Sequence, residues 1–254
     1  MKIFLTFCKK EVIENLRTFR LVIMFAVFIL IGIMNPMVAK MLPEILNGTD
    51  LGGITIQMDE PVAMDSWAQF FSNVSQIGVL VLAIVFCGIT ANELSKGTLI
   101  NILTKGMKRS TVILSKFSIT SLIWTISYAL CFVVTLVYNN YFWGSDPLPH
   151  ACLAFLSPWV FGLLLISLMI LGGICLKNII GSLAFAGGAV IIMGLLNLAP
   201  ALQKYNPISL SADTLNLING TSKPEDFIPA LIICLLITLA AIVDSILIFG
   251  RKQL

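Results

Sequence analysis

Six apolar stretches dominate the sequence, and each is long enough to cross the roughly 30 Å hydrocarbon core of a bilayer as a helix. We expect these spans at residues 21–39, 70–90, 112–138, 152–176, 179–198 and 227–249. Only 11% of the 254 residues are charged, whereas soluble domains carry about 25%. The sequence therefore predicts an all-α integral membrane protein in which residues 1–254 form one domain of six transmembrane helices.

Residues 1–20 are too charged to span a membrane, but they show helical amphipathicity. At about 100° per residue one face collects Leu5, Cys8, Val12, Leu16 and Phe19, and the opposite face collects Lys10, Glu14 and Arg17. We expect an amphipathic elbow helix in the membrane interface, with Lys9 and Arg20 directed toward lipid phosphates.

The predicted spans contain polar and small residues that indicate helix packing. Asn73 and Gln76 are three residues apart and share a helical face, so they either line a path or join two helices, and we favour a helix interface. Small residues four apart, such as Ala184 and Gly188, predict tight packing of the fifth span.

Pro158 and Gly172-Gly173 are expected to interrupt the fourth span, and Trp67, Phe70 and Phe71 to mark the membrane surface. The three aromatic residues follow an expected outer loop and stand where the second span begins.

The polar stretch 91–116 separates the second and third spans. It holds five basic residues against the single acid Glu93, and Leu99, Ile102 and Leu103 within it share one helical face. Gly97-Thr98 and Gly106 would bound a helix of about two turns, which is too short to be stable alone in water. Such a helix needs a surface to cover its apolar face. A loop whose charge only fixes topology is the simpler alternative.

The order of residues in this stretch resembles the first cytoplasmic loop of ABC-2 type permeases, the membrane subunits of one class of ABC transporter. The shared pattern consists of an acid that ends the second span, a Gly-Thr pair, a hydrophobic turn, a basic turn, an arginine and a lysine that enters the third span. These positions read Glu93, Gly97-Thr98, Leu99 to Leu103, Lys105 to Lys108, Arg109 and Lys116. The sequence departs from the pattern at Gly106, where a proline is usual, and at Ser115.

The resemblance implies a function and a set of partners. An ABC ATPase in two copies would bind a coupling helix, and a second permease subunit, identical or similar, would complete the path. Export of a hydrophobic or peptide-like compound is the expected activity. The residues implied in coupling to the ATPase are Glu93, Gly97, Thr98, Leu99, Ile102, Leu103, Lys105 and Arg109.

The distribution of basic residues predicts the orientation in the membrane. With both termini in the cytoplasm, all sixteen lysines and arginines except Lys40, Lys204 and Lys223 lie on the inner side. This bias agrees with the positive-inside rule. We therefore expect a multi-pass protein of the cell membrane, in a bacterium, and the net charge of +3 reflects this asymmetry rather than nucleic-acid binding.

The sequence lacks the motifs of several enzyme classes. It contains no P-loop, so ATP and magnesium would be bound by the partner ATPase and no cofactor by this chain. It contains neither HExxH nor GxSxG, and its six cysteines are scattered without metal-ligand spacing, so we expect no catalytic residues and no metal site. An intramembrane enzyme and a membrane sensor or scaffold remain the alternatives to a transport subunit.

Overall fold

The structure, a computed structural model, describes residues 2–47, 60–97, 107–144 and 148–251, and these form helices and turns without a strand. Six of its helices are long and apolar enough to cross a membrane, which confirms the predicted all-α membrane fold. The elements are α1 (Lys2–Arg17), α2 (Arg20–Asn47), α3 (Ala63–Asn73), the π-helical turn η1 (Val74–Gly78), α4 (Val79–Phe86), α5 (Ala91–Ser95), α7 (Arg109–Phe142), α8 (Ala151–Leu176), α9 (Ile179–Leu196), α10 (Pro200–Gln203), α11 (Ser209–Ala212), α12 (Thr214–Ile218) and α13 (Pro224–Arg251).

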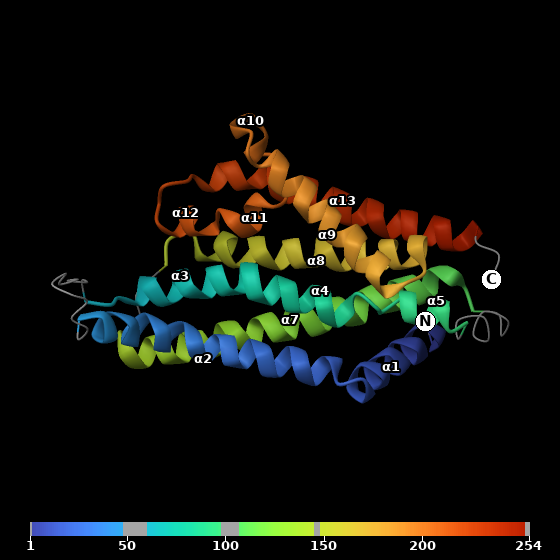
Figure 1. Cartoon of the computed structure of the whole chain (residues 1–254), viewed down its shortest axis with the longest axis horizontal. Helices are drawn as coiled ribbons and strands as arrows, with labels where there is room; N and C mark the ends of the chain where they lie inside the picture. Colours follow the sequence, from blue (N-terminus) through green and yellow to red (C-terminus); the bar gives the residue numbers. More distant parts are fainter. Residues whose placement is uncertain (1, 48–59, 98–106, 145–147, 252–254) are drawn as a thin grey trace.

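The long helices run roughly along the long axis of the molecule, with α8 at the centre (Figure 1). In its most apolar window 72% of the residues of α8 are buried, against 22% in α13 and 11% in α9. An apolar helix that is buried on all sides belongs to the core of the bundle. Helices α9 and α13 therefore form an outer layer against α8, and α2 and α7 form the opposite side of the bundle.

The two ends of the bundle differ in content. Figure 1 places both termini, α1 and α5 at one end, whereas α11 and α12 lie toward the other end and α10 projects from the side of the bundle. An even number of spans returns the chain to the side from which it started. The end that carries α1 and α5 is called the terminal end below, and residues 98–106 follow α5 in the sequence.

All the spans except the fifth, which ends at Leu196, are longer than the apolar stretches that predicted them. Helix α2 continues through Pro36 and Pro43 to Asn47. The second span begins at Ala63 and combines α3, η1, α4 and α5 up to Ser95. Helices extend beyond the hydrocarbon core because their polar ends can be solvated at the interface, which an apolar pattern does not register.

The fourth span is a continuous helix, so the predicted interruption at Pro158 and Gly172-Gly173 is wrong. A glycine here serves close packing instead. A side chain at Gly162 would overlap the ring of Trp124, and one at Gly173 would lie 3.2 Å from the backbone nitrogen of Ala91. The absent side chains therefore let α7 and α5 approach α8.

Aromatic residues predicted at the membrane surface lie inside the bundle. Trp67, Phe70 and Phe71 of α3 are buried and pack against Phe132 of α7 and Phe155 of α8. The rings of Phe132 and Phe155 lie 4.5 Å apart at 72°, a favourable edge-to-face arrangement. These residues follow the start of the span at Ala63 by four to eight residues, and the sequence did not predict that they would be buried in a cluster.

Helix α9 packs against α8 through Ser182 and Ala186, and Ser182 Oγ donates a hydrogen bond of 2.8 Å to the carbonyl of Met169. Ala184 is exposed, and a side chain added at Gly188 would meet nothing within 4 Å. The close packing predicted for Ala184 and Gly188 is therefore absent from the described part of the chain.

Candidate functional site

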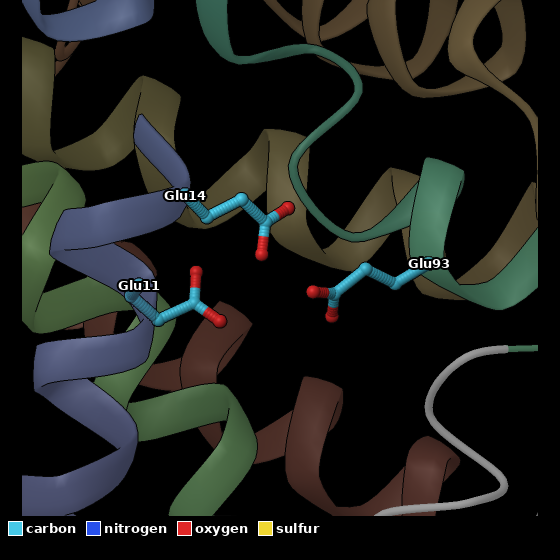
Figure 2. A group of neighbouring side chains, drawn as sticks. All are labelled: Glu11, Glu14 and Glu93. Carbon is cyan, nitrogen blue, oxygen red and sulfur yellow. The ribbon is translucent and has the colours of Figure 1, made fainter. Parts of the chain in front are cut away.

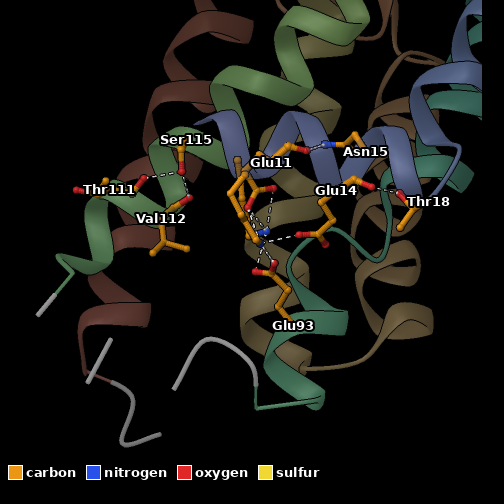
Figure 3. A network of polar contacts seen from close by, with 10 residues as sticks. Glu11, Glu14, Asn15, Thr18, Glu93, Thr111, Val112 and Ser115 are labelled. Atoms are coloured by element: carbon orange, nitrogen blue, oxygen red, sulfur yellow. Dashed lines mark hydrogen bonds and ion pairs between the residues drawn. The ribbon is translucent and has the colours of Figure 1, made fainter. Parts of the chain in front are cut away.

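Five charged side chains from three helices meet at the terminal end of the bundle. Helix α1 contributes Lys10, Glu11 and Glu14, α5 contributes Glu93, and α7 contributes Lys116. Figure 2 shows the three carboxylates pointing toward one another, and Figure 3 shows the ion pairs that join them. We call these five residues the ion cluster.

The inner half of the ion cluster is withdrawn from solvent. Lys116 Nζ lies 3.0 Å and 3.2 Å from the two carboxylate oxygens of Glu11 and 2.8 Å from Oε2 of Glu93. The side chains of Lys116 and Glu11 are 0% and 1% exposed. Buried charges are tolerated only when paired and hydrogen-bonded, so α1, α5 and α7 must keep this arrangement for each charge to be neutralised.

Lys10 forms the outer half of the ion cluster. Its ammonium contacts Glu93, lies 2.6 Å from Glu14 Oε2 and lies 3.1 Å from Glu11 Oε1. Partial burial of Lys10 disfavours its charge, but the bonds to Glu14 and Glu93 and the charge of Glu11 outweigh this effect and raise its pKa. Lys10 therefore remains protonated at neutral pH and holds three carboxylates together.

The three carboxylates Glu11, Glu14 and Glu93 come within 4.8 Å of one another, as carboxylates around a cation do. The ammonium of Lys10 contacts all three and supplies the positive charge that a metal ion would otherwise bring. A divalent ion would have to displace Lys10 and would then face Lys116. The chemistry of the donor set favours a structural charge network over a metal centre.

The ion cluster depends on which face of α1 turns inward. Phe7, Glu11 and Asn15 are buried at intervals of four residues, whereas Leu5 and Leu16 are exposed. Asn15 Nδ2 donates a hydrogen bond of 2.9 Å to the carbonyl of Glu11. The predicted apolar face packs on the bundle only through Cys8 and Val12, which border the core. Exposed Leu5, Leu16 and Phe19 are free to contact lipid, and the buried stripe contains a charge.

Glu11 was not singled out from the sequence, although one signal pointed to it. Lys116 stands among apolar residues at the start of the third span, and a lysine there requires an acidic partner. The sequence offers several acids and cannot choose among them without the packing of α1 on α7. The partner is 105 residues away along the chain.

The two ends of the predicted coupling segment are both anchored. Glu93 belongs to the ion cluster, and Gly97 closes the turn after α5 with a φ of 66°, a left-handed conformation that favours glycine. Arg109 begins α7, and its guanidinium donates hydrogen bonds to the carbonyls of Phe249 and Gly250 at the end of α13. The final carbonyls of a helix lack helical partners and attract cations.

The remaining predicted coupling residues lie outside the described part of the chain. These are Thr98, Leu99, Ile102, Leu103 and Lys105, together with the expected coupling helix itself. What the structure describes is the attachment of this segment, through α5 to α1 and α7 and through Arg109 to α13.

The polar residues of the second span have different surroundings. Asn73 Nδ2 donates a 2.8 Å hydrogen bond to Asn35 of α2, and Asn35 donates one of 3.2 Å to Thr135 of α7. Asn73 thus contributes to a contact among three helices. Gln76, in η1, instead lines a cavity, so the two amides do not act together.

Comparison with known sequences identifies no relative of this chain. No protein-family model and no curated protein matches the chain. The similarity to ABC-2 permeases therefore rests on the residues between the second and third spans and on the order of the spans.

Proposed function

We propose that this chain is the permease subunit of an ATP-driven transporter and that a separate ATPase binds the segment 98–106. The observation that carries this proposal is the buried ion cluster, because it joins the start of that segment to the bundle. A segment held in this way can pass a displacement into the membrane helices. A loop that only fixed topology would not need such an attachment.

The charge distribution supports a cytoplasmic position for the terminal end. Lys10 and Lys116 of the ion cluster, Lys96, Lys108 and Arg109 all belong to elements at this end. Lys40, Lys204 and Lys223, which we expect outside, belong to the opposite ends of α2 and α13 or to the connection between α9 and α13. This asymmetry satisfies the positive-inside rule, so the segment faces the compartment that holds ATP.

The attachments define which helices a bound ATPase would move. Through Glu93 and Lys116 the segment 98–106 is coupled to α1 and to the start of α7. Through Arg109 it is coupled to the end of α13. A pull on the segment would therefore act on the second, third and sixth spans together, whereas α9 packs mainly on α8 and touches α4 and α5 to a smaller extent.

The chain contains no sequence that cradles a nucleotide phosphate, so the energy for active transport would come from the partner. The resemblance to ABC-2 permeases gives two ATPase copies, a second permease subunit and export of a hydrophobic or peptide-like compound. Exposed apolar residues on α9 and α13, such as Ile180 and Leu239, offer surface for lipid and for such a second subunit.

Copurification in mild detergent tests the proposal. Changing Leu99 and Leu103 to Asp should abolish association with a soluble ATPase while membrane insertion remains, because two charges would enter a buried docking face. A matched control changes Leu198 and Leu202 to Asp. These are also leucines four residues apart, and both are exposed, beyond the end of α9 that lies away from the terminal end.

The control variant should retain the ATPase as wild type does. Loss of the ATPase from both variants would indicate general damage to the chain. Retention by the variant at 99 and 103 would remove the docking role of the segment, and the proposed function with it.

A further inference from the structure

A cavity of about 330 Å³ lies beside the π-helical turn η1 of the second span. Its apolar wall includes Phe71, Phe161, Val190 and Leu215, which come from α3, α8, α9 and α12. Its polar wall includes Ser72 and Gln76. The volume lies at the lower end of the range of small-molecule sites, and mostly apolar walls with a few polar groups are typical of such sites.

The cavity lies at the depth of the membrane core. Gln76 follows Ala63, the first residue of the span, by thirteen residues, which is about 20 Å at about 1.5 Å per residue. The remainder of the span up to Ser95 adds about 29 Å. With a hydrocarbon core of roughly 30 Å, Gln76 falls in the half of the core nearer to α11 and α12.

The π turn sets the local geometry of the polar wall. The amide of Val79 donates to the carbonyl of Val74, five residues earlier, in place of the ordinary spacing of four. Single π turns inside α-helices often occur at functional sites. Ser75 Oγ donates a 2.7 Å hydrogen bond to the carbonyl of Ser211, which fixes α11 against this turn and closes one side of the cavity.

Gln76 has unused hydrogen-bonding capacity in this place. The only hydrogen bond of its side chain within the described part of the chain runs from Nε2 to Ser72 Oγ at 3.2 Å, and this side chain is exposed to the cavity. A carboxamide offers two donor hydrogens and an acceptor oxygen. At membrane depth water is scarce, so an amide of this kind is stabilised by a bound polar group.

The described residues around the cavity carry no charge. A charged ligand would lose its hydration without gaining an ion pair, so the walls favour an uncharged one. We infer that this cavity binds an uncharged amphipathic molecule, whose hydroxyl or amide group hydrogen-bonds to Gln76 and whose apolar body packs between Phe71 and Phe161. This binding site does not depend on the proposed transport function.

Photolabelling of the full-length protein in lipid nanodiscs tests the site. The probe is a diazirine-bearing octanol, compared with diazirine probes of equal chain length that end in a methyl group or in a carboxylate. The alcohol should label peptides containing Phe71, Phe161 or Val190 several times more strongly than either comparison probe. An excess of monoolein in the bilayer or of dissolved N-acetyl-leucine amide should compete, and the one that competes identifies a membrane or an aqueous source of the ligand.

Two substitutions locate the interaction. Gln76→Leu should weaken half-maximal labelling about two- to tenfold, as expected for the loss of one hydrogen bond. Gln69→Leu, the same change in the same span but outside the cavity wall, should leave labelling unchanged. Val190→Phe should fill the cavity from α9 and reduce labelling without removing a polar group.

Thermal unfolding in the same nanodiscs shows that each variant is folded. Equal labelling by the alcohol and the methyl-ended probe, unaffected by Gln76→Leu, would overturn the inference and leave an apolar cavity only. Preferential labelling by the carboxylate would overturn the assignment of an uncharged ligand. Unchanged labelling in Val190→Phe would overturn the location.

Discussion

Removal of the buried lysine of the ion cluster gives the sharpest test of its energetics. Lys116→Met keeps the length and apolar stem of the side chain but removes the ammonium that lies 3.0 Å from Glu11 and 2.8 Å from Glu93. Glu11 is 1% exposed and would keep only Lys10, at 3.1 Å, as a counter-ion. Removing one member of a buried ion pair costs about 3 to 5 kcal/mol. Because Lys10 remains close, we expect a loss of about 3 kcal/mol in the free energy of unfolding.

The measurement is unfolding in mixed micelles, followed by tryptophan fluorescence. Lys96→Met, the same change at an exposed lysine near the cluster, should cost no more than about 0.5 kcal/mol. The double variant Glu11→Leu with Lys116→Met replaces the buried pair by apolar groups and should recover most of the loss. A loss below about 1 kcal/mol for Lys116→Met, or a double variant less stable than Lys116→Met alone, would refute the reasoning.

Three further changes test other contacts. Arg109→Ala should speed hydrogen exchange in the last turn of α13, because charge-assisted bonds to two carbonyls are lost, and unchanged exchange there would argue against the anchor. Gly162→Ala should destabilise the fold by about 1 to 3 kcal/mol through overlap with Trp124, whereas Gly187→Ala, in open space, should be neutral or stabilising by up to about 1 kcal/mol. Folding raises the pKa of Lys10, so the contribution of Lys10 to the free energy of unfolding is complete at pH 6 to 8. This contribution declines only as the pH rises above the ordinary lysine value of about 10.4. The loss of stability caused by Lys10→Met should therefore be equal at pH 6 and at pH 8.

The spans could be predicted from the sequence because the requirement for an apolar length of about twenty residues is local. Their exact ends could not, since α2 and the second span continue into polar residues whose helical state depends on neighbours. The same holds for Pro158. A proline that looks like an interruption in sequence is accommodated inside α8, where neighbouring helices surround it.

The candidate site was only partly visible in the sequence. Glu93, Arg109 and Lys116 stand out because they flank a short polar segment between two spans, and their neighbours along the chain carry the pattern. Glu11 and Lys10 belong to the site only because α1 packs on α7. The helical periodicity of residues 1–20 instead predicts that these charged residues face away from the apolar side of the helix. A buried ion pair between distant residues overrides the apolar periodicity, and periodicity alone gives no sign of it.

The π turn and its cavity also escape prediction. Ser72, Asn73 and Gln76 read as polar residues of one helix, and only the change of helical spacing at Val74–Gly78 separates the roles of the two amides. Asn73 then joins α2 and α7 through Asn35, while Gln76 turns to the cavity. Backbone spacing of this kind has no recognised residue signature.

Photocrosslinking from the segment 98–106 in intact cells tests the central claim most directly. A benzophenone amino acid at position 103 should form a covalent adduct with a cytoplasmic ATPase, and the same amino acid at position 202, in α10 beyond the end of α9 that lies away from the terminal end, should form none. An ATPase adduct from position 202, or the absence of one from position 103 in a folded and inserted protein, would contradict the account.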